Sequence, residues 1–160
     1  MKNDKLFRQS LMIILVTNKK TQFNYFLLDK YEAGLVLTGH EVKSIKEGRL
    51  SLKGAFISIQ QGELYLVNAQ ISSFQPANAP TDFNPERPKK ILLKRKEIKS
   101  LIGKVKEKGI TLIPLKIYLR RNKIKLELAL AKGKKKWDKK EIIKERDIKR
   151  RMRRVKIYKT

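Results

Sequence analysis

The sequence has no cysteine and a single histidine, His40, among its 160 residues. Without thiols the chain forms neither a disulfide framework nor a thiolate metal site, and one imidazole has no second histidine with which to bind a metal. The patterns GxGxxG and GxxxxGK[ST], whose glycines cradle phosphates, are also missing. We therefore predict no catalytic residue, no metal and no cofactor. His40 lies in a helix-capping sequence and is expected to be structural.

Long hydrophobic runs are missing as well. The apolar stretch Leu11–Val16 is too short to span a bilayer and shorter than the core of a signal peptide, and no small-residue cleavage site follows it. We interpret residues 1–17 as an N-terminal extension and first strand; an upstream extension ahead of a true start at Met12 is the alternative. The protein is expected to be cytoplasmic and to have no membrane partner.

Negative charge is scarce. The chain has 40 Lys and Arg residues but 15 Asp and Glu residues, which gives a formal net charge of +25. Self-repulsion at this density opposes a compact fold unless a polyanion neutralises it. Each Lys or Arg that meets a phosphate also releases a condensed counterion. We therefore predict a nucleic acid as the partner, in preference to a membrane surface or an acidic protein.

The middle of the chain shows the period-two alternation of β-strands. Apolar residues alternate with polar ones from Leu115 to Leu119 and from Ile124 to Leu130, on either side of Arg121-Asn122. This pattern predicts a hairpin with one apolar face and one cationic face. A second hairpin is expected across Gln61-Gly62, where the flanking residues alternate in the same way.

Two helices and a proline-rich loop interrupt the strands. Thr38-Gly39-His40-Glu41 matches a capping box and predicts a helix that Gly48 can close. Apolar residues with i, i+3, i+4, i+7 spacing over Ile98–Val105 predict a second helix, which stops before Gly109. Four of the five prolines lie between Gln75 and Lys90, a pattern typical of an irregular surface loop.

These elements predict a mostly β fold with two or three helices (α+β). Tyr25 to Leu37 reads as one long β-prone stretch, broken at Ala33-Gly34 by a bend or bulge. Short strands with a helix in mid-chain favour a small antiparallel barrel of the oligonucleotide/oligosaccharide-binding (OB) type. We expect this RNA-binding barrel over residues 18–132 and a basic C-terminal tail over residues 133–160.

The tail is dominated by cations. Residues 134–160 contain 14 Lys and Arg residues against four acids. Ile148, Met152 and Val155 form an apolar stripe that is too narrow to hold a helix on the barrel. The tail has helix-forming side chains and no Pro or Gly, so we expect it to be disordered when free and helical in a polyanionic channel. A merely disordered basic tail is the alternative.

The aromatic residues fall into two groups. The aromatic residues in predicted strands are Tyr25, Phe26, Tyr31, Phe56, Tyr65, Phe74 and Tyr118. We expect most of these seven to lie in the core of a small barrel. Tyr118 lies on the cationic face of its hairpin and is the better candidate for stacking on a base. Trp137 stands among lysines with no apolar neighbour, which also suits stacking on an exposed base.

One pair of carboxylates leaves an enzymatic alternative open. Asp29 and Glu32 lie close together in the sequence and have basic neighbours, as in a metal-dependent nuclease. Two acids near a strand bend are a weak signal, and solvation at the surface is the commoner reason for them.

Four blocks of residues, collinear from about Asn18 to Lys140, have the sequence motifs of one bacterial family. They are Asn18–Lys20 with Tyr25, Tyr31–Leu35 with Gly39–Ser44, Asn84–Leu93, and Ala131–Lys135 with Asp138–Lys140. With these blocks the chain resembles the SsrA-binding protein family, also called small protein B (SmpB). Members of this family are partners of tmRNA in bacterial ribosome rescue.

The resemblance implies an OB-type barrel that clasps the tRNA-like domain of tmRNA near its elbow. Asn18, Glu32 and Leu92 would fall at contact positions of the family, with nearby cations on phosphates. The expected tmRNA-binding residues are Asn18, Lys19, Lys20, Glu32, Lys43, Arg87, Lys90, Leu92, Tyr118 and Lys125.

The resemblance also implies that the tail enters the decoding centre and the vacant mRNA channel of the small ribosomal subunit. It would fold there into a helix that stands in for codon and anticodon. The expected contact residues are Lys134, Lys135, Trp137, Asp138, Lys139, Lys140, Arg146, Lys149 and Arg150. Elongation factor Tu and alanyl-tRNA synthetase would be partners through tmRNA, and the protein would act as a monomer in the complex.

Three positions depart from the family pattern. Lys140 stands where the family has Arg, so the charge is kept and the planar fork is lost. Trp137 stands where histidine or another aromatic is common, and Lys53–Phe56 replaces the usual Asp-Ser-Tyr. A structural ribosomal protein or an initiation-factor-like OB protein, which would bind ribosomal RNA without tmRNA, is the alternative to the family assignment.

Overall fold

The computed structural model describes residues 12–157, with side chains up to residue 154. The expectations for residues 1–11, for residues 158–160 and for the side chain of Val155 lie outside the described residues. The elements are β1 (Met12–Thr17), α2 (Thr21–Asn24), β2 (Tyr25–Leu35), α3 (Gly39–Lys46), β3 (Leu50–Ser51), β4 (Phe56–Gln60), β5 (Glu63–Val67), β6 (Gln70–Ile71), the 3-10 turn η1 (Pro76–Asn78), β7 (Lys89–Leu92), α4 (Arg95–Val105), β8 (Ile110–Arg120), β9 (Lys123–Gly133) and α5 (Lys136–Ile157).

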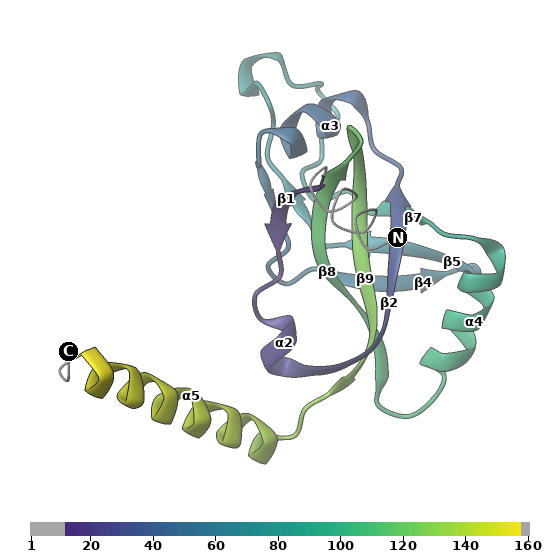
Figure 1. Cartoon of the computed structure of the whole chain (residues 1–160). Helices are drawn as coiled ribbons and strands as arrows, with labels where there is room; N and C mark the ends of the chain where they lie inside the picture. The colour runs from purple at the N-terminus through teal and green to yellow at the C-terminus, as the bar shows by residue number, and fades with distance from the viewer. Residues whose placement is uncertain (1–11, 158–160) are drawn as a thin grey trace, which may run out of the picture.

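The strands form a curved antiparallel sheet in the order β1-β8-β9-β2-β7-β5-β4, beside a small β3–β6 pair. Although β4 stands at the opposite edge of the sheet from β1, it also lies close to β8, because the sheet curls around its core (Figure 1). The prediction of a mostly β α+β fold is confirmed. No helix over residues 12–157 combines the length and the apolar composition needed to cross a membrane.

Both predicted hairpins are present. At the tip of β8–β9, Arg121 and Asn122 have φ angles of 49° and 61°. At the tip of β4–β5, Gln61 and Gly62 have φ angles of 49° and 75°. Two successive left-handed residues match the right-handed twist of the flanking strands, so these turns fix the register of both hairpins.

The predicted bend or bulge at Ala33-Gly34 is wrong, because β2 continues through these two residues. The irregularity lies earlier, between Leu27 and Lys30, where the pairing with β9 shifts register. At Ala33-Gly34 the strand changes partner: Ala33 pairs with β9, and Gly34 pairs with Leu92 of β7. A Cβ on Gly34 would lie 3.4 Å from the Leu92 Cβ, so the glycine allows close approach of the two strands.

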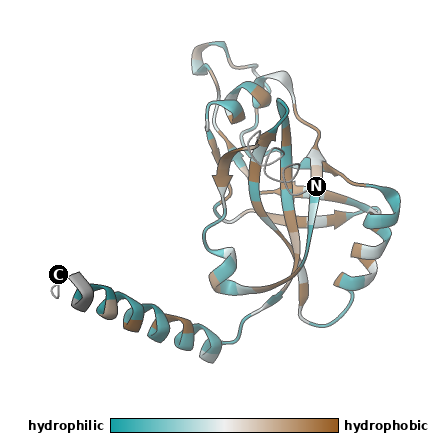
Figure 2. Cartoon of the chain, in the orientation of Figure 1, coloured by the Kyte–Doolittle hydropathy of each residue, from teal (hydrophilic) through white to brown (hydrophobic). Residues whose placement is uncertain are grey.

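The core is aliphatic. Its buried residues are mainly Leu, Ile and Ala from the inner positions of the strands together with Ile45 and Leu101 of the two body helices (Figure 2). The prediction that most strand aromatics lie in this core is wrong. The exposed fractions of Phe26 and Phe56 are 48% and 45%, and Tyr118 is buried outside the core clusters. Leucine and isoleucine fill the narrow interior, and of these aromatics only Tyr25 and Tyr31 pack against the core clusters, where both are partly buried.

Helix α3 begins with the predicted capping box. The Thr38 Oγ1 accepts a hydrogen bond from the Glu41 N–H at 3.2 Å, and a Glu41 carboxylate oxygen accepts the Thr38 N–H at 2.9 Å. Gly48, with φ of 74°, follows the C-terminal end of the helix. His40 has the structural role expected of it: its Nε2 accepts the Phe74 N–H at 3.2 Å. The helix is thereby fixed to the proline-rich loop.

Glu41 also binds Arg87 from that loop. The Arg87 Nε and one of its terminal nitrogens donate to the two carboxylate oxygens at 3.1 and 2.6 Å, and the Glu41 side chain is only 2% exposed. Burial by itself raises the pKa of Glu41, but the bonds from Arg87 and Thr38 outweigh it, so the pKa is lowered. Arg87 also donates to the Val36 carbonyl at 3.3 Å and so joins loop, helix and strand end.

Lys89 is a fully buried cation beneath the same loop. Its Nζ donates to the Ala69 carbonyl at 2.8 Å and to the Pro85 carbonyl at 3.3 Å. Burial disfavours the ammonium, and the pKa of Lys89 falls to about 8 despite the nearby Glu41 carboxylate. The charge therefore opposes folding, while its two hydrogen bonds hold the loop against the β5–β6 segment.

We predict that Arg87→Ala lowers the free energy of unfolding by about 2 kcal/mol, because it leaves the Glu41 carboxylate buried without its ion pair. Lys104→Ala is the control, since its pair with Asp29 is largely solvated; we expect it to cost much less stability than Arg87→Ala. Urea unfolding of both variants and the wild type measures the difference. Equal losses would contradict the assigned role of Arg87.

Candidate nucleic-acid interface

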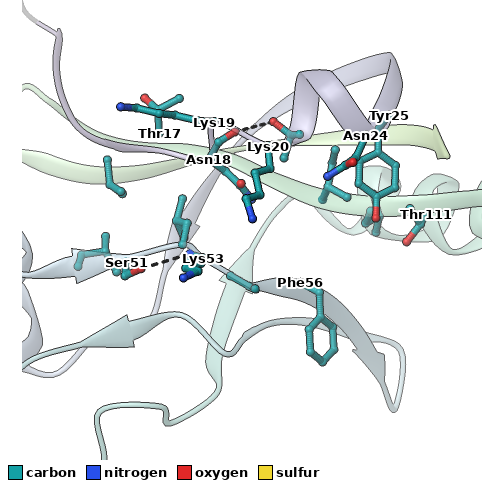
Figure 3. A pocket seen from close by; sticks show the side chains of 18 residues that line it. Thr17, Asn18, Lys19, Lys20, Asn24, Tyr25, Ser51, Lys53, Phe56 and Thr111 are labelled. Atoms are coloured by element: carbon teal, nitrogen blue, oxygen red, sulfur yellow. Dashed lines mark hydrogen bonds between the residues drawn. The ribbon is translucent and has the colours of Figure 1, made fainter. Parts of the chain in front are cut away.

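A groove of about 700 Å³ opens between the β1–α2 junction and the β3–β4 loop (Figure 3). Its floor comes from the start of β8. The lining residues are Val16, Thr17, Asn18, Lys19, Lys20, Thr21, Asn24, Tyr25, Leu50, Ser51, Leu52, Lys53, Gly54, Ala55, Phe56, Thr111, Leu112 and Ile113. The groove thus combines cations, amides and hydroxyls with apolar and aromatic surface.

The upper wall of the groove carries three of the predicted binding residues. The Asn18 N–H donates to the Leu115 carbonyl at 2.7 Å, and its Nδ2 donates to the Pro114 carbonyl at 3.3 Å. Thr21 Oγ1 donates to the Asn18 carbonyl at 2.8 Å and starts the short helix α2. Asn18 is therefore held in place at the end of β1, and it leaves Lys19 and Lys20 exposed beside it.

The lower wall was not predicted as part of a site. Lys53 faces Asn18 across the groove, and Phe56 lies beyond it at the rim (Figure 3). The turn between them contains Gly54 with φ of 75°, a conformation that favours glycine. Cations on both walls with an exposed aromatic ring suit a nucleic-acid strand, because phosphates meet the lysines and a base can stack on the ring.

A second group of predicted residues shares the outer face of the sheet. Register pairs place Tyr118 opposite Lys125, Glu32 opposite Glu127, and Gly34 opposite Leu92. Paired and i+2 residues point to the same side of an antiparallel sheet. The predicted tmRNA-binding residues that lie on this outer face are Glu32, Lys90, Leu92, Tyr118 and Lys125. Leu92 is half exposed there, and Lys90 forms an ion pair with Glu63.

Glu32 is the centre of a polar cluster on this face. It accepts a hydrogen bond from the Tyr118 hydroxyl and two from Arg120, at 2.9 and 3.1 Å. Burial raises the pKa of Glu32, but the bonds from Tyr118 and Arg120 and the charge of Lys125 outweigh it, so the pKa is lowered. Arg120 belongs to this cluster although the sequence analysis did not select it.

Tyr118 is not an exposed stacking platform, so that expectation is wrong. Its side chain is buried, its hydroxyl is bound to Glu32, and the Lys116 Nζ lies 5.6 Å from its ring centroid. Burial and the Glu32 carboxylate raise the pKa of Tyr118, which keeps the hydroxyl protonated as a donor. Tyr118 therefore positions Glu32 and has no free ring face for a base.

The remaining predicted residues of the body lie elsewhere. Arg87 holds Glu41, as described above, and Lys43 lines a smaller pocket of about 450 Å³ with His40 and Phe74 at the α3 end. Asp29 pairs with Lys104 at 2.9 Å, whereas Glu32 binds Tyr118 and Arg120. The two carboxylates of the nuclease alternative are thus bound to different partners and do not form one site.

The tail leaves the body at one fixed point. The Lys134 N–H donates to the Asn24 carbonyl and its Nζ donates to the Gln22 carbonyl, both at 2.8 Å. The same Nζ lies 4.9 Å from the centroid of the Phe26 ring. Three contacts on one residue fix the direction in which the chain leaves β9.

Beyond this root, α5 extends away from the body (Figure 1). The Lys135 N–H donates to an Asp138 carboxylate oxygen at 2.8 Å, so Asp138 caps the first turn of the helix. The side chain of Trp137 is 62% exposed. Arg146 lies 5.5 Å from the centroid of the Phe23 ring, and α5 therefore contacts α2. Most other described side chains of α5 are exposed and hydrophilic (Figure 2).

Comparison with known proteins identifies the family. The model of the SmpB protein family matches residues 15–158, which begin within β1 and include nearly all of the tail. The chain belongs to the SmpB family. It is 51% identical over 137 residues to the SsrA-binding protein of Sulfurihydrogenibium sp. strain YO3AOP1, covering 86% of this chain and 90% of that protein. It is 48% identical over 139 residues to the SsrA-binding protein of Persephonella marina, covering 87% and 91%.

A solved structure supports the fold and the family. The chain is similar to one described as "tmRNA-SmpB: a journey to the center of the bacterial ribosome", with a TM-score of 0.62 and 41% sequence identity. The similarity covers 76% of this chain and 85% of that chain. The family suggested by the sequence motifs is thereby confirmed, and with it the small α+β architecture.

We predict that Tyr118→Phe lowers the free energy of unfolding by about 1 kcal/mol near pH 7, because it removes a hydrogen bond to ionised Glu32. Because the pKa of Glu32 is lower in the folded protein than in the unfolded chain, ionised Glu32 stabilises the fold at pH values above its unfolded-state pKa, near 4.5. This contribution disappears as pH falls through the folded pKa. The difference between wild type and variant should therefore shrink as the pH falls below about 4.5.

Urea unfolding at pH 3 to 7 measures this difference. Tyr65→Phe is the matched control, because the Tyr65 hydroxyl has no hydrogen-bond partner recorded within residues 12–157. A pH dependence of the same size in Tyr65→Phe would contradict the Glu32–Tyr118 assignment.

Proposed function

We propose that this protein binds the tRNA-like domain of tmRNA and delivers it to stalled ribosomes for trans-translation, with no chemical step of its own. The observation that carries the proposal is the family match over residues 15–158, which spans both the body and the basic tail. The partners are tmRNA and the small-subunit RNA of the ribosome. The protein acts as a monomer in the cytoplasm, and it meets elongation factor Tu and alanyl-tRNA synthetase through tmRNA.

The groove is the proposed seat of an RNA strand. Lys19, Lys20 and Lys53 stand on its two walls, where their ammonium groups can neutralise successive phosphates. Asn18 is fixed by two hydrogen bonds and offers an amide that can recognise sugar or base. Phe56 supplies the stacking surface that the buried Tyr118 does not.

The outer face provides the second proposed contact with tmRNA. Glu32 is an acceptor held in one orientation by Tyr118 and Arg120, so it selects donors such as a base amine or a 2′-hydroxyl. Leu92 offers half-exposed apolar surface next to it, and Lys90 and Lys125 supply positive charge. Arg87 acts indirectly by holding α3 and the loop, and Lys43 stands at that end of the body.

The tail is the proposed ribosome-binding part, disordered when free and helical on the ribosome. Lys134 and Asp138 shape it by fixing its root and capping its helix. Trp137 is exposed for stacking on a ribosomal base. The remaining proposed contacts in the decoding centre and mRNA channel are Lys135, Lys139, Lys140, Arg146, Lys149 and Arg150.

We predict that Lys20→Gln combined with Lys53→Gln weakens binding to the tRNA-like domain and lowers its logarithmic salt slope by about 2, one unit for each lost phosphate contact. Lys46→Gln with Lys108→Gln is the control, because it removes the same charge at exposed positions outside both the groove and the outer face of the sheet. Gel-shift titrations at stated salt concentrations compare the RNA with an ordinary tRNA. Equal affinity for both RNAs would favour the general ribosomal RNA-binding alternative.

A second prediction separates the body from the tail. A chain ending at Lys135 keeps the Lys134 contacts with Gln22 and Asn24 and should bind the tRNA-like domain nearly as well as the full chain. It should fail to support peptide tagging on stalled ribosomes, since α5 is missing. A gel shift and a reconstituted tagging assay measure the two activities. Loss of RNA binding in the shortened chain would show that the tail belongs to the tmRNA site.

A further inference from the structure

The outward side of α4 carries a row of cations that none of the sites above includes. Arg95, Lys99 and Lys106 follow i, i+4 and i+11 spacing, which places them on one side of the helix, and Lys96 lies next to them. All four are exposed, whereas Leu101 on the opposite side is buried against the sheet. We name Arg95, Lys96, Lys99 and Lys106 the α4 basic face.

These cations are not neutralised by acids of the body. Over residues 12–157 none of the four forms an ion pair. The nearby Glu97 is turned to the start of the helix, where its carboxylate accepts the Lys94 N–H at 3.0 Å. Lys104, on another side of α4, does pair with Asp29. The α4 basic face therefore keeps its full positive charge for an external anion.

Gly103 provides an independent observation at the same place. It lies four residues after Lys99 and three before Lys106, in the helix interior and exposed. A Cβ built on Gly103 meets no atom within 4 Å, and its backbone does not have the positive φ that favours glycine. Glycine weakens a helix relative to alanine, so the fold alone gives no reason for it. A bare backbone amid cations allows a partner to approach the helix closely.

We propose that the α4 basic face binds the phosphate backbone of ribosomal RNA, as a contact separate from the groove and the tail. Figure 1 places α4 on the other side of the strands from α2 and α5, so this contact is open while the groove is occupied. RNA is favoured over a membrane because Ile102, the apolar residue on the same stripe of the helix, is half-buried, and Leu101 and Val105 are packed on the core. The proposal rests on the proposed function for the identity of the ribosome as partner.

The test compares two triple variants of the full chain that each remove three charges. Arg95→Gln with Lys99→Gln and Lys106→Gln alters the face; Lys30→Gln with Lys46→Gln and Lys123→Gln is the control. Binding to purified ribosomes is measured over a range of salt concentrations. We expect the α4 variant to bind ribosomes more weakly, with a logarithmic salt slope lower by about 3, and the control to bind nearly as the wild type does.

Gly103→Leu provides a second variant that does not depend on charge. Leucine is a better helix former, so the melting temperature should rise while ribosome binding falls. The proposal is overturned if both α4 variants bind ribosomes like the wild type, if the control loses as much, or if the wild type does not bind ribosomes. Binding to the isolated tRNA-like domain should be unchanged in the α4 variants; its absence in the wild type would refute the proposed function instead.

A photoreactive side chain at Ser100, beside the face, identifies what lies there on the ribosome. Cross-links to ribosomal RNA support the proposal. Cross-links to tmRNA alone, or to a ribosomal protein alone, overturn it.

Discussion

Repulsion among like charges is the constraint on which this structure depends. The whole chain has 15 acids for 40 cations, and repulsion among the excess cations opposes compaction. Glu41 of α3 binds Thr38 and Arg87, and Glu127 lies between Lys30 and Lys116 on the sheet. These two acids thus join separate elements of the body through ion pairs, and exposed cations without such a pair remain available to a polyanion.

Lys89 shows how the body holds a cation where no carboxylate is bonded to it. The ammonium is buried against two backbone carbonyls, and its lowered pKa shows that this burial disfavours the charge. In return, the Ala69 carbonyl receives a donor that a hydrocarbon side chain could not supply, and the Pro85 carbonyl, which also accepts the Ile71 N–H, receives a second one. Hydrogen bonds of Lys89, Arg87 and His40 therefore hold the proline-rich loop against the body, and they also attach α3 to the loop.

Features encoded by neighbouring residues could be predicted from the sequence. The Thr38–Glu41 capping box, the Arg121-Asn122 turn and the strand alternation need only a few adjacent side chains, and each is present as expected. Tyr118 was misjudged because alternation tells which face a residue is on, but not that Glu32, 86 residues away, covers its hydroxyl. The lower groove wall was missed for the same reason, since Lys53 meets Asn18 only in the folded chain.

The fixed root of the tail has a consequence for how the two proposed RNA contacts would be coupled. Lys134 is bonded to the carbonyls of Gln22 and Asn24, so α5, with 22 residues and a length of about 33 Å, starts from a defined point and not from a flexible linker. Under the proposed function, binding of the body would confine the tail to a restricted volume, and binding of the tail would become an intramolecular step. The distance between the two RNA targets would then decide whether the second contact strengthens the first.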